Sequence, residues 1–183
     1  MKPAITQTIK ILKNGGVAVV PTDTLYGLVG QASNKKTVAR IYKIKGRSGG
    51  KPFIILISSI KDLETFEIKT DNKLGLDLKK FWPGPTSIIL PCKSEKFKYL
   101  HRGTKTLAFR LPRKNALLNM LRKTGPMVAP SANPQNLPPA KSAEEARLYF
   151  GDKVDFYLNG LKPKHKPSRI IKINNEVIEI VRN

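Results

Sequence analysis

The chain has 183 residues and carries 34 Lys and Arg against 13 Asp and Glu, a formal net charge of +21. Apolar residues make up 40% and charged residues 26%, which predicts a globular chain and excludes an intrinsically disordered one. A single cysteine excludes an intrachain disulfide framework and fits a reducing cytoplasm, and two distant histidines argue against a structural zinc site. No apolar run is long enough to span a membrane. The length favours one domain over residues 1–183, and the charge favours a polyanionic partner.

Apolar periodicity predicts helices and strands that alternate along the chain. The expected helices cover residues 5–12, 34–46, 74–81, 117–121 and 142–151, and the expected strands cover residues 17–20, 53–57, 86–90, 107–111, 127–129, 154–158, 169–173 and 177–182. Such interleaving is typical of a layered α/β domain with a mixed sheet.

Residues with strong capping or turn preferences bound these elements. Asn34 is the expected N-cap of the second helix and Gly46 its end. Trp82-Pro83 stops the third helix, and Ser142 with Glu145 predicts a capping box at the last one. Asn174-Asn175 predicts the turn of a C-terminal hairpin.

The stretch from Lys43 to Pro52 contains four cations and three glycines, with no acid among them. Glycines let backbone N–H groups approach a ligand closely and cations supply charge, so the stretch is suited to a polyphosphate. It is not a P-loop, because no Gly-Lys-Ser/Thr opens a helix. A solvated basic turn is the alternative interpretation.

Two further polar loops follow buried strands, where ligands of α/β sheets usually bind. Residues 22–28 offer Thr and Tyr hydroxyls, although an ordinary turn is the alternative, and residues 130–134 offer Ser131 and Asn133. Arg110 lies within a strand and points either to solvent or into a cleft. His101 and His165 lie outside the three loops and are expected at the surface. Without an acid–base dyad, catalytic triad or Cys nucleophile, the loops favour catalysis by positioning and charge stabilisation.

Five motifs in this order resemble the YrdC/TsaC family of L-threonylcarbamoyladenylate synthases. They are residues 21–28 (PTDTLYGL), 45–47 (KGR) with Pro52 behind them, 81–86 (FWPGPT), 106–110 (TLAFR) and 129–133 (APSAN). The resemblance covers roughly residues 10–182 and fits the short form of the family, with one domain. It implies a YrdC/RibB-like twisted open sheet with flanking helices and a concave basic face.

The resemblance also implies a reaction. L-Threonine, bicarbonate or CO₂, and ATP would give threonylcarbamoyl-AMP and pyrophosphate, with Mg²⁺ carried by ATP and no metal ligand from protein side chains. A downstream threonylcarbamoyl transferase complex would then modify the adenosine beside the anticodon of tRNA in the cytoplasm. Such an enzyme is a nucleotidyltransferase.

The motifs imply roles for eleven residues. Lys45 and Arg47 are the expected catalytic residues on the triphosphate. Further ATP contacts are expected from Thr106, Ser131, Asn133 and Arg182, and threonine contacts from Thr22, Thr24, Tyr26, Arg110 and Ser168. The chain departs from the family pattern at Lys51, Gln135-Asn136, Lys141 and Ser168-Arg169.

Two other functions stay open. A non-catalytic module that binds tRNA or double-stranded RNA would use the +21 charge through counterion release. Aromatic residues are only 7% and no RNP-like stacking motif is present, which argues against it. A carbamoyl-transfer accessory domain, as in hydrogenase-maturation proteins, would need attached segments that this sequence lacks.

Overall fold

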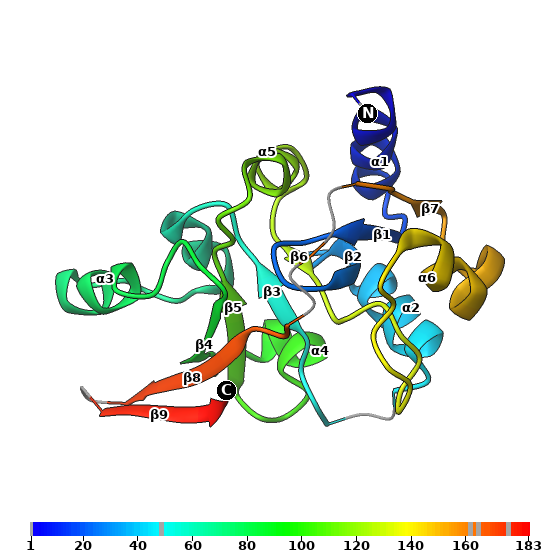
Figure 1. Cartoon of the computed structure of the whole chain (residues 1–183). Helices are drawn as coiled ribbons and strands as arrows, with labels where there is room; N and C mark the ends of the chain where they lie inside the picture. The colour runs from blue at the N-terminus through cyan, green and yellow to red at the C-terminus, as the bar shows by residue number, and fades with distance from the viewer. Residues whose placement is uncertain (1, 48–49, 161–162, 164–165, 175–176) are drawn as a thin grey trace.

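The computed structural model describes residues 2–47, 50–160, 163, 166–174 and 177–183. Within them, nine strands form one sheet in the order β7-β1-β2-β6-β3-β5-β4-β8-β9 (Figure 1). The strands are β1 (Ala18–Pro21), β2 (Tyr26–Gln31), β3 (Ile54–Leu56), β4 (Thr86–Pro91), β5 (Thr106–Arg110), β6 (Met127–Val128), β7 (Phe156–Tyr157), β8 (Arg169–Asn174) and β9 (Val177–Arg182). The helices are α1 (Lys2–Lys13), α2 (Lys35–Lys45), α3 (Asn72–Lys79), α4 (Lys98–His101), α5 (Asn115–Thr124) and α6 (Ala143–Phe150), with 3-10 turns η1 (Ile60–Phe66), η2 (Glu95–Phe97) and η3 (Gly151–Lys153).

The sheet is mixed, which confirms the expected α/β class. β1 pairs parallel with β7, β3 with β5 and β4 with β8, and the other neighbours pair antiparallel. β8 and β9 form the expected C-terminal hairpin, whose turn at residues 175–176 lies outside the described residues.

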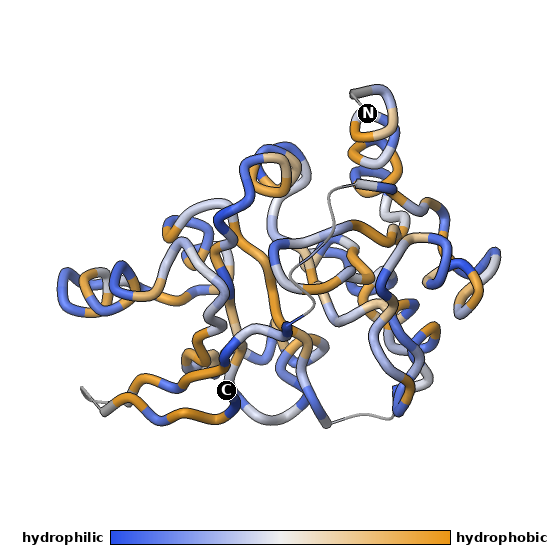
Figure 2. The backbone as a smooth tube through the Cα atoms, viewed as in Figure 1, coloured by the Kyte–Doolittle hydropathy of each residue, from blue (hydrophilic) through white to orange (hydrophobic). Residues whose placement is uncertain are grey.

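Two clusters of buried apolar side chains fill the space on the two faces of the sheet. The smaller one joins α1 and α5 to β1, β2 and β6 through residues such as Leu12, Val20 and Leu117. The larger one joins α2, α6 and η1 to the other face, with Ile41, Ile55 and Phe66 among its members. Figure 1 shows α1 and α5 above the sheet and α2 and α4 below it. Figure 2 shows hydrophobic residues running along the strands.

The caps of α2 are confirmed, and those of α6 are confirmed in part. Asn34 Oδ1 accepts a hydrogen bond from Thr37 N at 3.1 Å, and Gly46 ends α2 in the left-handed conformation at φ 61°. Ser142 Oγ accepts from Glu145 N at 3.1 Å. The Glu145 carboxylate accepts from Lys141 N rather than from the cap residue, so the reciprocal half of the predicted capping box was wrong.

Residues 26–28 belong to β2, whereas the sequence predicted that the loop extends to residue 28. Pairing with β1 makes this segment extended, and Leu28 N also donates to Pro130 O at 2.8 Å. These partners lie far along the chain or across a turn, so local propensity did not indicate the strand.

The expectation of a surface position for His101 was wrong. Its side chain is buried at the end of α4, and only 1% of the residue is exposed. Its Nδ1 accepts from Gly103 N at 3.1 Å, because the chain turns back at Arg102, which has φ 52°. His165 lies outside the described residues. No described helix combines the length and apolarity needed to cross a bilayer.

Candidate active site

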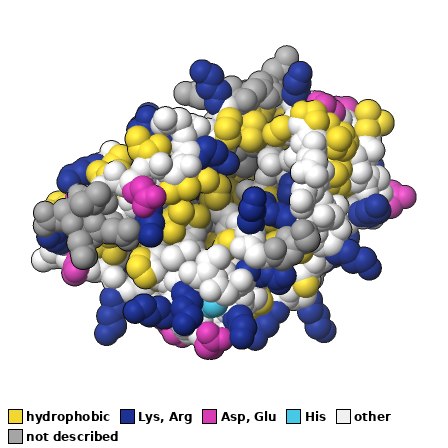
Figure 3. All heavy atoms as spheres, turned by 90° about the horizontal axis from the view of Figure 1, so that it is seen from below, with side chains coloured by type: hydrophobic (Ala, Val, Ile, Leu, Met, Phe, Trp, Pro, Cys, Tyr) yellow, Lys and Arg dark blue, Asp and Glu magenta, His cyan; other side chains and the backbone are white. Residues whose placement is uncertain are grey.

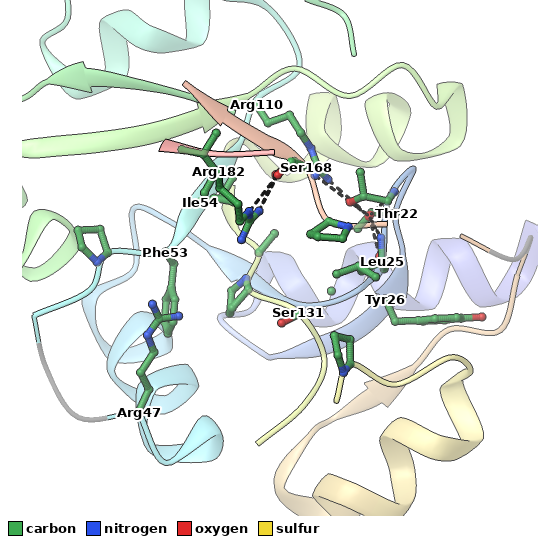
Figure 4. Close-up of a pocket in the computed structure, with 18 residues that line it drawn as sticks. Thr22, Leu25, Tyr26, Arg47, Phe53, Ile54, Arg110, Ser131, Ser168 and Arg182 are labelled. Atoms are coloured by element: carbon green, nitrogen blue, oxygen red, sulfur yellow. Dashed lines mark hydrogen bonds between the residues drawn. The ribbon is translucent and has the colours of Figure 1, made fainter. Parts of the chain in front are cut away.

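A cavity of about 470 Å³ opens between the three polar loops and the start of β8 (Figure 4). Its lining includes Thr22, Thr24, Leu25, Tyr26, Arg47, Phe53, Ile54, Arg110, Ser131, Ser168 and Arg182. A second cavity of about 390 Å³ shares Arg47 and Ser131 with the first and is also lined by Lys45, Lys51, Asn133, Gln135 and Asn136. The two together have room for a small polar molecule beside a longer, phosphate-bearing one.

The Thr22 hydroxyl fixes the loop between β1 and β2. Its Oγ1 donates to Leu25 O at 2.6 Å and accepts from the backbone N–H groups of Thr24 and Leu25 at 3.1 and 3.2 Å. The hydroxyls of Thr22 and Thr24 are 3.1 Å apart. Both threonines are buried, so the turn presents a preformed polar wall to the cavity.

Arg110 points into the cavity, which decides between the two orientations that the sequence left open. Its Nη1 donates to Thr24 Oγ1 at 2.8 Å, and its Nη2 lies 3.1 Å from Asp23 Oδ1. Its Nε is buried and has no hydrogen-bond partner among the described residues. Burial lowers the pKa of Arg110, Asp23 opposes this shift, and the nearby Arg182 adds to it. The guanidinium is therefore a buried cation with a free donor.

Asn133 shapes the loop after β6 around the end of α2. Ser131 Oγ donates to Asn133 Oδ1 at 2.6 Å, and Asn133 Nδ2 donates to Pro134 O and Leu137 O. The loop also pairs with β2, because Ala132 N donates to Tyr26 O at 2.8 Å. These bonds place the Ser131 hydroxyl where the two cavities meet.

Lys45 turns its ammonium group toward the protein. Nζ donates to Ser131 O at 2.7 Å and Asn133 O at 2.6 Å, and lies 3.4 Å from Asn133 Oδ1. Burial, and secondarily the charge of Arg47, lowers the pKa of Lys45 to about 8. A direct contact between Lys45 and a phosphate would require one of these bonds to break. The structure shows Lys45 holding the Ser131–Asn133 loop, and its contact with phosphate stays a prediction.

Ser168 and Arg182 bring the C-terminal hairpin to the cavity. The Ser168 and Ser87 hydroxyls are 2.9 Å apart, and Arg182 donates through Nη2 to Ser168 O at 2.7 Å. Burial lowers the pKa of Arg182. Figure 4 shows Arg182 and Ser131 between Arg47 and Phe53 on one side and Thr22 on the other.

The structure brings most of the predicted site residues together. All of the expected threonine contacts line the first cavity, and Lys45, Arg47, Ser131 and Asn133 line the second. Tyr26 is 3% exposed, and burial raises the pKa of its hydroxyl. Thr106 is the exception: it begins β5, at the other end from Arg110, and lines neither cavity.

Sequence reasoning missed two residues beside these cavities. Asp23 faces Arg110. Its position between two threonines, in a chain with few acids, could have marked it as a candidate site residue. Phe53 lines the first cavity, but its apolar neighbours made it indistinguishable from the core of β3. Within the described part of the chain, no cluster of three or more His, Cys, Asp or Glu side chains could hold a metal ion.

A family model named for Sua5, YciO and YrdC, with the description "Telomere recombination", matches residues 10–183. The chain belongs to this family. Membership of the Sua5/YciO/YrdC family confirms the resemblance of the five motifs.

Named relatives of this Sua5/YciO/YrdC chain include enzymes. It is 34% identical over 170 residues to the threonylcarbamoyl-AMP synthase of Coxiella burnetii (strain RSA 493 / Nine Mile phase I), which covers 91% of both chains. It is 37% identical over 144 residues to the enzyme of the same name from Bacillus subtilis (strain 168), covering 78% of this chain and 42% of that one. The chain thus spans less than half of the Bacillus relative and nearly all of the Coxiella relative.

Solved structures of the family have the same fold. P. abyssi Sua5 complexed with L-threonine gives a TM-score of 0.88 at 30% identity, covering 97% of this chain and 53% of that chain. E. coli YciO gives a TM-score of 0.86 at 26% identity, covering 100% of this chain and 90% of that one.

Proposed function

We propose that this chain is a nucleotidyltransferase that makes L-threonylcarbamoyl-AMP and pyrophosphate from L-threonine, bicarbonate or CO₂, and ATP. The observation that carries the proposal is that one cavity has a buried arginine, Arg110, on one side and a second arginine, Arg47, on the other. Arg110 is a buried guanidinium with a free Nε near the Thr22 and Thr24 hydroxyls, and Arg47 joins the first cavity to the second. The names of the relatives from Coxiella and Bacillus support the same reaction.

Threonine would occupy the end formed by the loop after β1. Its carboxylate is the natural partner of Arg110, because a guanidinium offers a fork of N–H donors to two oxygens. The side-chain hydroxyl and the amine would face Thr22, Thr24 and Ser168. The complex of P. abyssi Sua5 with L-threonine supports a threonine site in this fold.

ATP would place its phosphates between Arg47 and the loop of Ser131 and Asn133. Mg²⁺ enters as part of the ATP substrate, since Asp23, the acid of the first loop, is paired with Arg110. Lys45 would add positive charge and hold the Ser131–Asn133 loop. Arg182 would close over the nucleotide from β9, and a direct contact from Thr106 stays a prediction that would need a nucleotide extending beyond the two cavities.

The reaction needs no covalent intermediate with the protein. The threonine amine attacks CO₂, forming a C–N bond and releasing a proton to solvent, and gives a carbamate. A carbamate oxygen then attacks the α-phosphorus, and the bond from that phosphorus to the bridging oxygen breaks as pyrophosphate leaves. The protein contributes orientation of the two substrates and fixed cations beside the developing charge.

The partners of this reaction are part of the proposal. The product would pass to a downstream threonylcarbamoyl transferase complex that modifies the adenosine beside the anticodon of tRNA, in the cytoplasm. Lys and Arg side chains are spread over the face in Figure 3, with few acidic ones among them. This surface, with the +21 charge, is compatible with tRNA or double-stranded RNA as a further ligand, which is also the alternative function.

The test is release of pyrophosphate from MgATP and bicarbonate with and without L-threonine. We expect release only with threonine, and formation of threonylcarbamoyl-AMP detectable by mass spectrometry. Arg47→Ala should lower kcat/KM by a factor that corresponds to a loss of about 2–4 kcal/mol of transition-state stabilisation. Lys43→Ala, on the exposed face of α2, should leave kcat/KM unchanged. No threonine-dependent release under any condition would leave the RNA-binding alternative.

A further inference from the structure

We propose that Phe53 and Tyr42 are positioning residues that hold the Arg47 guanidinium at the boundary of the two cavities. The Arg47 guanidinium carbon lies 5.3 Å from the centre of the Phe53 ring. That ring stacks on Tyr42 with centroids 3.9 Å apart and an interplanar angle of 20°. Figure 4 shows the Arg47 side chain beside the Phe53 ring. The inference deepens the proposed function, because it rests on Arg47 binding the phosphates of ATP.

Arg47 needs an anchor because of its place in the chain. It directly follows Gly46, which ends α2, and its backbone N–H donates to Tyr42 O at 3.1 Å. No acidic side chain of the described residues forms a salt bridge with it. The ring contact is therefore the interaction that the described structure offers to the guanidinium.

A ring holds a guanidinium differently from a carboxylate. A cation–π contact is made through the face of the guanidinium plane or its edge, so N–H donors stay available for an anion. A carboxylate would occupy those donors and neutralise the charge. An arginine held by Phe53 is thus fixed in direction and remains ready for phosphate oxygens.

The stack is itself anchored through Tyr42. Tyr42 lies on α2 and its hydroxyl donates to Lys51 O at 3.0 Å, which ties the segment before β3 to the helix. A second guanidinium, that of Arg102, lies 4.7 Å from the centre of the Tyr42 ring. Tyr42 and Phe53 are 7% and 3% exposed, so the rings have little freedom to move. The result is a continuous series of contacts from Arg102 through the two rings to Arg47.

Simple core packing would not explain this arrangement. Phe66 is also buried and contacts the rings of Phe97 and Phe109, but it lines neither cavity, and no Lys or Arg of the described residues makes a cation–π contact with it. Phe53 contacts a cavity-lining cation and lines the cavity itself. The two phenylalanines therefore make a matched pair for experiment.

The experiment is a double-mutant cycle on MgATP binding, measured by calorimetry without threonine, with inorganic tripolyphosphate as a second probe. Phe53→Leu should weaken binding of MgATP by about 3- to 10-fold, and Phe53→Tyr, which keeps the ring, should restore it to within about twofold. In the Arg47→Ala background, Phe53→Leu should have less than about a twofold further effect. Phe66→Leu should lower the unfolding temperature and leave the affinity unchanged.

Several results would overturn the inference. If Phe53→Leu lowers the affinity for MgATP equally with Arg47 present and in the Arg47→Ala background, the ring does not act through Arg47. If Phe66→Leu lowers the affinity as much as Phe53→Leu does, the effect is general destabilisation. Binding of neither probe by the unmodified chain would overturn both this inference and the proposed function. If MgATP binding follows the expected cycle but threonine releases no pyrophosphate, the proposed function fails while the positioning role stands.

Discussion

Arg110 Nη2 lies 3.1 Å from Asp23 Oδ1, and the two side chains are only 5% and 14% exposed. The contact is an ion pair without a well-aligned hydrogen bond, because Asp23 Oδ1 has no hydrogen-bond partner in the described structure. Asp23 thus offsets the cost of burying the guanidinium while leaving donors open. An incoming carboxylate would meet a charged, incompletely satisfied partner.

Replacing Asp23 should make the protein depend on its ligand. In Asp23→Asn the buried Arg110 loses its neutralising charge and still lies near Arg182, so the free energy of unfolding should fall by about 2–4 kcal/mol. L-Threonine should raise the unfolding temperature of this variant more than that of the unmodified chain, because its carboxylate would replace Asp23. The measurement is thermal unfolding across a threonine titration. Equal increases in the unfolding temperature of Asp23→Asn and of the unmodified chain would contradict the prediction.

The guanidinium shape of Arg110 should matter as well as its charge. Arg110→Lys keeps the cation but loses the fork that donates to Thr24 and faces Asp23. We expect the KM for threonine to rise about 10- to 100-fold with a smaller change in the KM for ATP, from steady-state pyrophosphate release. Arg113→Lys, at an exposed arginine, is the matched control and should leave both values unchanged.

Stability should depend on pH through Lys45. Its pKa of about 8 is below the usual 10.5, so between these values the unfolded chain binds more protons than the folded one. The free energy of unfolding contributed by this group therefore rises with pH through that window. Relative to Lys45→Met, the unmodified chain should gain about 2 kcal/mol between pH 7 and 9.5, measured by urea unfolding. If the difference in free energy of unfolding between the unmodified chain and Lys45→Met does not change with pH, Lys45 keeps an ordinary pKa.

Gly30 should tolerate no side chain. A Cβ built there would lie 2.4 Å from Thr37 Cγ2 and 3.0 Å from Ile41 Cδ1, both on α2. Gly30→Ala should lower the free energy of unfolding by about 1–3 kcal/mol, because α2 must move away from β2. Gly75→Ala, within α3 and with no atom closer than 4 Å, should instead stabilise by up to about 1 kcal/mol. Denaturant midpoints of the two variants test the contrast.

Much of the framework follows from the sequence because it rests on local preferences. The caps at Asn34 and Gly46 follow from side-chain chemistry and glycine freedom within a few residues. The apolar runs that became β1, β3 and β4 are local too. Strand β2 (Tyr26–Gln31) was not predicted at all, because the bonds that extend residues 26–28 come from β1 and from Pro130.

For the candidate site, too, some features follow from the sequence and others only from the tertiary structure. The sequence by itself determined which loops carry cations, hydroxyls and amides, since composition and motif order are properties of the chain. The tertiary structure decided where those groups point: Lys45 toward the Ser131 carbonyl, and Arg110 into the cavity against Asp23. It also decided that Phe53 contacts Arg47. The orientations of Lys45 and Arg110 come from burial and from partners distant along the chain, which no local pattern encodes.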